Sequence, residues 1–307
     1  MSIFQQFWCA RLGIHQPSPR TLRGVQRPTL SVGNAARASQ WAIRRLTASR
    51  RSLPDFLIVG AQRAGTTSLY RWLAAHEGVH PAFRKEVHYF DLHFSKGLSW
   101  YRANFPLQEA PGITGEATPY LLFHPLAPGR IAEQVPEAKL IVVLRHPVER
   151  AISHFSYMRA LGIEPLTLPE AIAAEPRRLR GTEEQVSEGG KSPAHQHFSY
   201  VAKGMYASQL RRWFEVFGAQ SLLLVESGEL FRSERARRSV LVHLGLAPAG
   251  VPFPTTHGAA RNFTPADDLD AVRQTLADLY REPNTELFTL IGRTLWADEP
   301  AQPDSAP

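Results

Sequence analysis

The stretch from Pro54 to His76 (PDFLIVGAQRAGTTSLYRWLAAH) contains the residues of this chain that are best suited to bind an anion. Its loop and the turn that follows combine a cation, small residues and hydroxyls: Gly60, Arg63, Ala64, Gly65, Thr66, Thr67 and Ser68. If the hydroxyl residues begin a helix, the unpaired N–H groups and the positive dipole end of that helix face the loop. We therefore predict an anion site at this corner.

The spacing of the two glycines is similar to the phosphate-binding pattern G-x-x-x-x-G-K-[ST]. The position of the lysine holds Thr66 here, and the basic residue stands inside the loop, at Arg63. This difference argues against an ordinary ATPase or kinase. A tight strand-to-helix turn without a ligand is the alternative, because glycine-rich turns of this type are common.

Two further groups of residues could do chemistry beside such an anion. In FRKEVHYFD, Glu86 and His88 share one face if the segment is extended, which places a carboxylate and an imidazole together. In LRHPVERAISHF, Arg145 ends an apolar run, at the sheet edge where ligands bind in doubly wound folds. Ser153 follows on the predicted helix.

These residues must be positioned by alternating strands and helices. Unbroken apolar runs predict buried strands at 56–59, 140–144 and 222–225, and β-prone residues predict a strand at 87–90 and another, broken by Pro119, within 114–125. Helices are predicted between them, with two more at 269–281 and 286–296. The alternation predicts an α/β, P-loop-like fold, in which a parallel sheet has helices on both faces as a three-layer sandwich.

Charge is distributed unevenly along the chain. The 307 residues carry a formal net charge of +7, yet residues 1–54 contain nine arginines and no acidic residue. The remaining 253 residues contain 26 basic and 28 acidic side chains, so the body is not a basic nucleic-acid binder. We predict a basic flexible tail over residues 1–53, a domain over 54–298 with a mobile insertion at about 176–194, and a short tail over 299–307.

Cysteine content and hydropathy bear on location. Cys9 is the only cysteine, which fits a reducing compartment, and no run of about 18 apolar residues predicts a membrane span. The segment 38–51 places Trp41, Ile43 and Leu46 beside arginines, which suits a weak contact with an anionic membrane surface. The tail also has the composition of an organelle presequence. We predict a cytoplasmic protein, peripheral at the membrane surface if the tail binds lipid.

Several segments, in their order, resemble the heparan sulfate sulfotransferase branch of the family that uses 3′-phosphoadenosine 5′-phosphosulfate (PAPS), in a compact bacterial-type form. The resemblance covers roughly residues 54–295 and rests on GAQRAGTTSLY, KEVHYFD, GLSWY, GEATPY, LRHPVERAISHF, GMYASQLRRW, LLLVESGEL and REPNTELFTLIGRTLW. It implies PAPS as co-substrate, sulfuryl transfer to a hydroxyl or amine of a carbohydrate or glycolipid, and no metal.

The resemblance also implies roles for single residues. The donor's 5′-phosphosulfate would be held by Arg63, Ala64, Gly65, Thr66, Thr67 and Ser68, and its 3′-phosphate by Arg145 and Ser153. Arg261, in ARNF, is similar to the arginine of a late PAPS-binding loop. Glu86 would be the catalytic base, with His88 the next candidate, and Arg63 would neutralise charge on the leaving phosphate.

Two positions depart from the family pattern. Members usually have lysine where this chain has Arg63, and arginine keeps the charge but does not readily donate a proton. Glycosaminoglycan enzymes have a lysine in GEATPY where this chain has Ala117, so heparan sulfate itself is a poor guess for the acceptor. A P-loop nucleotide kinase and a degenerate, non-catalytic nucleotide-binding module remain as alternatives.

Overall fold

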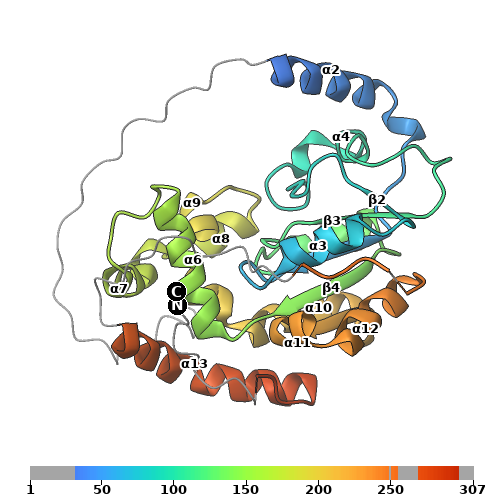
Figure 1. Cartoon of the computed structure of the whole chain (residues 1–307). Helices are drawn as coiled ribbons and strands as arrows, with labels where there is room; N and C mark the ends of the chain where they lie inside the picture. Colours follow the sequence, from blue (N-terminus) through green and yellow to red (C-terminus); the bar gives the residue numbers. More distant parts are fainter. Residues whose placement is uncertain (1–31, 249, 255–268, 297–307) are drawn as a thin grey trace.

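The computed structural model describes residues 32–248, 250–254 and 269–296, and its centre is a five-stranded parallel sheet (Figure 1). In spatial order the strands are β2 (Val79–Pro81), β3 (Ile113–Ala117), β1 (Phe56–Gly60), β4 (Lys139–Leu144) and β5 (Leu222–Glu226). Every residue of β1 is buried, as its unbroken apolar run predicts. The predicted α/β fold and its three apolar strands are confirmed.

Helices cover both faces of the sheet, because the connections between parallel strands are right-handed. Helix α3 (Thr66–Ala74) follows β1 and shares one face with α12 (Glu234–Leu244), since Trp72 and Leu241 line the same cavity. Helix α5 (Ala127–Gln134) connects β3 to β4 and packs against α10 (Tyr206–Phe217), which precedes β5. Because β1 and β4 are parallel neighbours, their carboxyl ends lie side by side at one edge of the sheet.

The remaining described α-helices include three longer ones, α2, α6 and α13. In chain order these remaining helices are α2 (Val32–Leu46), α4 (Leu98–Arg102), α6 (Pro147–Ala160), α7 (Leu168–Arg178), α8 (Thr182–Ser187), α9 (Pro193–His197), α11 (Ser227–Arg232) and α13 (Leu269–Ile291). The prediction of two helices at the C-terminal end is wrong, because α13 continues through Pro283. Buried Tyr280 and Leu287 on either side of the proline hold the helix against the domain. The late loop that the resemblance implies around Arg261 lies outside the described residues.

The segment that we predicted as a mobile insertion, residues 176–194, is helical and anchored in the structure. Glu164 accepts hydrogen bonds from Arg178 at 2.5 and 3.0 Å, and Glu175 accepts from the backbone N–H groups of Val201 and Ala202. These bonds tie α7 to the chain on either side of the segment. Within the segment, Arg178 and Glu183 also form ion pairs with Glu164 and Arg212.

The strand predicted at Val87–Phe90 is wrong, and the segment forms turns. A strand would alternate inward and outward side chains, but Tyr89 and Phe90 are both buried, and Tyr89 stacks on Tyr101 with ring centroids 4.5 Å apart. His88 has a φ of 55°, a left-handed conformation that ends extended structure. The segment still lies along β3, because the Ala117 N–H donates to the Lys85 carbonyl at 3.2 Å.

The structured chain begins well before the boundary at residue 54 that we predicted. Trp41 of α2 stacks on Phe83 at 5.7 Å between ring centroids, and the guanidinium of Arg44 donates to the carbonyls of Ala103 and Phe105. Helix α2 therefore packs against aromatic residues of the domain, and Figure 1 shows it next to α4. No helix within the described ranges is long and apolar enough to cross a membrane.

Candidate active site

The predicted anion loop joins β1 to α3 at the carboxyl edge of the sheet. Gly65 is the N-cap of α3 with a φ of +95°, and no side chain caps this helix end. A Cβ on Gly65 would lie 3.0 Å from the ring of Phe231, so both the backbone conformation and the space favour glycine. The first N–H groups of α3 at this end are suited to an anion, and Thr66, Thr67 and Ser68 form the first turn of the helix.

Arg63 reaches from the loop to helix α6. Its Nε donates to the Oγ of Ser153 at 3.1 Å, and its guanidinium lies over the ring of Tyr157, 4.7 Å from the centroid. Burial lowers the pKa of Arg63 from its ordinary value, but an arginine stays charged at neutral pH. The loop arginine and Ser153, 90 positions apart in sequence, are therefore direct neighbours.

Arg145 joins the same group from the end of β4. One of its Nη atoms donates to the carbonyl of Arg63 at 3.3 Å, and its own carbonyl accepts a hydrogen bond from Tyr206 at 2.9 Å. The structure thus brings together the two arginines and the serine that the sequence analysis assigned to a doubly phosphorylated ligand. Arg261, the remaining residue of that prediction, lies outside the described residues.

Glu86 and His88 also lie together, in a chain of charged groups that ends at Asp91. His88 Nε2 is 3.4 Å from a carboxylate oxygen of Glu86, and His88 Nδ1 is 2.7 Å from Asp91. Burial alone would lower the pKa of His88, but the two carboxylates raise it to about 10. Burial would likewise raise the pKa of Glu86, but hydrogen bonds from His88 and Lys85 lower it to about 2. At neutral pH this site therefore holds a carboxylate beside an imidazolium.

Glu116, which the sequence analysis did not single out, holds this segment in place from the end of β3. It is buried and accepts hydrogen bonds from the Val87 N–H, the Tyr101 hydroxyl and the Thr118 hydroxyl at 3.1, 2.7 and 2.6 Å. Burial raises the pKa of Glu116 to about 7 despite these bonds. Its role depends on contacts between segments about 30 residues apart. The only sequence signal was an acidic residue within a buried strand.

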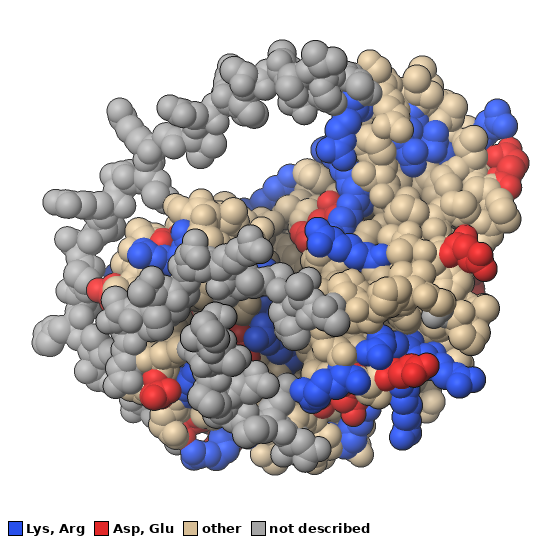
Figure 2. Space-filling model, viewed as in Figure 1, with Lys and Arg blue, Asp and Glu red and all other residues tan. Residues whose placement is uncertain are grey.

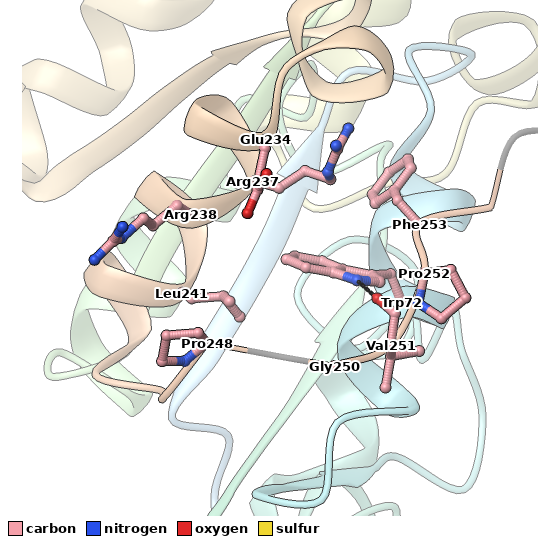
Figure 3. Close-up of a pocket in the computed structure, with 10 residues that line it drawn as sticks. All are labelled: Trp72, Glu234, Arg237, Arg238, Leu241, Pro248, Gly250, Val251, Pro252 and Phe253. Atoms are coloured by element: carbon pink, nitrogen blue, oxygen red, sulfur yellow. Dashed lines mark hydrogen bonds between the residues drawn. The ribbon is translucent and has the colours of Figure 1, made fainter.

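A cavity of about 320 Å³ lies between α3 and α12, beyond the anion loop (Figure 3). Phe253 and Trp72 border it with their rings 5.5 Å apart, and the Trp72 indole N–H donates to the carbonyl of Val251. Phe253 also packs on Phe231, 5.2 Å between centroids, and Phe231 in turn lies against Gly65. The loop is therefore flanked by an aromatic surface suited to a planar base.

Charged side chains of both signs are interspersed on the face shown in Figure 2. This mixture agrees with the near-neutral composition of the body. Among residues 32–248, 250–254 and 269–296, no group of three histidine, cysteine or acidic side chains is placed to hold a metal ion.

The model of the sulfotransferase domain family matches residues 53–237, which span the anion loop, the Glu86 segment and α6. The chain belongs to the sulfotransferase family. This match confirms the resemblance found in the sequence. The matched range includes the loop in which the basic residue, Arg63, stands two residues before Gly65 and Thr66 takes the position of the P-loop lysine.

Named relatives place this sulfotransferase near the heparan sulfate branch. Heparan sulfate glucosamine 3-O-sulfotransferase 6 from Homo sapiens is 37% identical over 187 residues, which are 61% of this chain and 50% of that protein. Bifunctional heparan sulfate N-deacetylase/N-sulfotransferase 1 from Caenorhabditis elegans is 31% identical over 192 residues, 60% of this chain and 21% of that protein. The chain thus spans half or less of these relatives.

A solved structure agrees with the fold over a wider range. The sulfotransferase from Alicyclobacillus acidocaldarius has a TM-score of 0.61 and 27% sequence identity, and the alignment covers 80% of this chain and 98% of that one. The compact bacterial-type form expected from the sequence therefore has a counterpart of nearly the same extent.

Proposed function

We propose that this sulfotransferase moves a sulfuryl group from PAPS to a hydroxyl or amine of a carbohydrate. The observation that carries the proposal is the convergence of Arg63, Arg145 and Ser153 beside an uncapped helix end. The helix end suits the 5′-phosphosulfate. The second arginine and the serine suit the 3′-phosphate, which PAPS has and ATP lacks. The base of the donor would lie against the aromatic surface at Phe231 and Phe253.

The proposed reaction divides among the residues as follows. The acceptor oxygen bonds to sulfur while the bond from sulfur to the 5′-phosphate oxygen breaks, and the electron pair stays on the phosphate. Arg63 and the first N–H groups of α3 stabilise that charge. Glu86 takes the acceptor proton, and because its basicity is low, the proton moves late, after the new bond has made the hydroxyl acidic.

Calorimetry with three nucleotides tests the proposal against a nucleotide kinase. We expect 3′-phosphoadenosine 5′-phosphate (PAP) to bind much more tightly than ADP or ATP, because only PAP carries the 3′-phosphate. Equal binding of ATP and PAP would contradict the proposal. Turnover of labelled PAPS with a pooled glycan extract then distinguishes an enzyme from a degenerate, non-catalytic binding module.

Replacing Arg145 by alanine should weaken PAP binding about 10- to 150-fold, the effect of losing one charge-assisted hydrogen bond of about 1.5–3 kcal/mol. Binding of adenosine 5′-phosphosulfate, which lacks the 3′-phosphate, should barely change. Calorimetry with both ligands measures the difference. Arg159→Ala, on the exposed side of α6, is the control. Equal losses for both ligands would mean that Arg145 supports the fold rather than the phosphate.

The acceptor is proposed to be less acidic than heparan sulfate. Ala117 is completely buried and supplies no cation at the position where glycosaminoglycan enzymes have a lysine.

A glycolipid at a membrane surface fits the exposed side of α2, where Ile43 and Leu46 are 60% and 86% exposed beside Arg45. Apolar side chains among arginines suit an anionic bilayer surface.

Vesicles of anionic phospholipid test this contact. Co-sedimentation should weaken by ~10-fold for each of Ile43→Ser and Leu46→Ser, because each loses about 1.5 kcal/mol of apolar burial. Binding should also fall with added salt. Val242→Ser, an exposed apolar residue on α12, is the matched control. Undiminished binding of both α2 variants would exclude this surface.

A further inference from the structure

Lys203 is a buried cation with neutral partners. It lies between α9 and α10 and is 3% exposed. Its Nζ donates to the side-chain oxygen of Gln62 at 2.7 Å and to the carbonyl of Gln196 at 2.5 Å. It also lies over the rings of Tyr120 and Phe123, 5.0 and 5.8 Å from their centroids. None of these four groups carries a formal negative charge.

The contacts of Lys203 join three segments around the anion loop. Gln62 belongs to the loop itself and directly precedes Arg63, and Gln196 belongs to α9. Tyr120 follows β3 and is bonded in turn to His195 of α9, with its hydroxyl 2.6 Å from the ring nitrogen. A change at Lys203 would therefore loosen both the anion loop and its link to α9.

Keeping this ammonium out of water is unfavourable unless something offsets its charge. The nearby carboxylate is Glu175, but its oxygens accept from the backbone N–H groups of Val201 and Ala202. The ionisable groups around Lys203 from the packed elements are Arg150 and His154 of α6, Glu175 of α7, His195 and His197 of α9, and Tyr120. Cations and neutral groups outnumber the single acid. An anion in the loop would therefore be a natural counter-charge.

We propose that Lys203 is a positioning residue for sulfuryl transfer: through Gln62 it fixes the anion loop that carries Arg63, and its charge complements the donor anion. The role of the charge toward the donor rests on the proposed function. The hold on the anion loop through Gln62 concerns the free protein and does not depend on it. Burial lowers the pKa of Lys203 well below its usual value, and Arg150 lowers it further, so the charge would be lost at a lower pH than for an exposed lysine.

Kinetics of Lys203→Met and Lys203→Arg test the role in transfer. With labelled PAPS and a pooled glycan extract, Lys203→Met should lower kcat on the order of 10- to 100-fold, and KM for PAPS should rise by a smaller factor, on the order of threefold to 10-fold, because the charge that complements the donor anion is lost. Lys203→Arg should restore most of kcat. Wild-type kcat should fall as pH rises through the lowered pKa, whereas the arginine variant should show no such fall. Lys191→Met, an exposed lysine before α9, is the control. Wild-type kcat and pH profile in Lys203→Met would overturn the inference.

Hydrogen exchange in the free protein gives a readout that needs no donor or acceptor. Amides of residues 61–65 should exchange faster in Lys203→Met and in Gln62→Leu, but not in Lys191→Met. Because the two variants break one shared bond, their combination should add little to either alone. Unchanged exchange in Lys203→Met would overturn the inference even if PAP does not bind. A lack of PAP binding with faster exchange would contradict only the proposed function.

Discussion

Replacing Glu86 by glutamine should slow turnover of PAPS by about 10²–10⁴-fold and leave PAP affinity nearly unchanged. Glutamine keeps the shape of the side chain but cannot accept the acceptor proton. The carboxylate is 43% exposed in its side chain, so an acceptor can reach it, whereas the anion loop that binds the donor is separate. Single-turnover kinetics with labelled PAPS and a pooled glycan extract measure the first effect, and calorimetry with PAP measures the second.

The surroundings of Glu86 supply an internal check on this variant. Removing the Glu86 charge should lower the pKa of His88 from about 10 toward the ordinary histidine range, because one of its two anionic partners is lost. Nuclear magnetic resonance titration of His88 would record the shift. Glu77→Gln, an exposed acid on the surface, should change neither quantity. Normal turnover of Glu86→Gln would assign the proton to another group or indicate an amine acceptor.

The same contacts predict the pH dependence of turnover. The carboxylate of Glu86 stays ionised down to about pH 2, so no acid limb should appear in the ordinary carboxylate range. His88 keeps its proton up to about pH 10. Because of its contacts with Glu86 and Asp91, His88, the second candidate for the base, is a hydrogen-bond donor at neutral pH. It would therefore orient Glu86 rather than take a proton from the acceptor.

Replacing Arg63 by alanine should damage both binding and chemistry. We expect PAP affinity to fall about 10- to 100-fold, because a charge-assisted contact is lost, and kcat/KM to fall about 10³- to 10⁵-fold, the range for cations that stabilise a leaving phosphate. The second loss is larger because charge grows on the bridging oxygen as the bond to sulfur breaks. Calorimetry and PAPS turnover on the same samples separate the two effects.

A conservative variant distinguishes charge from shape at this position. Arg63→Lys should retain or raise turnover, because lysine keeps the charge and can also donate a proton. Arg71→Ala, an exposed arginine in the last turn of α3, is the control. A large loss in Arg63→Lys with intact PAP binding would mean that the contacts of the guanidinium with Ser153 and Tyr157 are needed for turnover.

The sequence predicted those parts of the fold in which one local pattern decides the outcome. The runs at β1 and β4 are apolar throughout, and only a strand covered on both faces buries every residue of such a run. The strand prediction at Val87–Phe90 was wrong because its β-prone residues are buried in an aromatic cluster that includes Tyr101. No local pattern contains that contact. The prediction of two helices separated at Pro283 was wrong for the same reason, since tertiary packing on both sides overrides the tendency of this proline to end a helix.

The residues of the candidate site also divide into those that the sequence predicted and those that it did not. Arg63, Arg145 and Ser153 were found because the family resemblance links positions that are far apart in sequence. Glu116 and Lys203 were missed because their importance lies in their partners: Lys203 meets Gln62 across 141 positions, and nothing in KGMYASQL indicates it. Asp91 could have been noticed, since it stands three residues after His88.

The hydrogen bond from Arg63 to Ser153 links the two phosphate subsites that we propose. If the 3′-phosphate of the donor binds at Ser153, as the resemblance to the family implies, the serine can donate its hydroxyl proton to the phosphate while its oxygen still accepts from Arg63. The same bond would then hold the Arg63 guanidinium in place beside the 5′ end, so occupation of one phosphate subsite would favour occupation of the other. Ligands carrying only one phosphate would underestimate the contribution of each subsite.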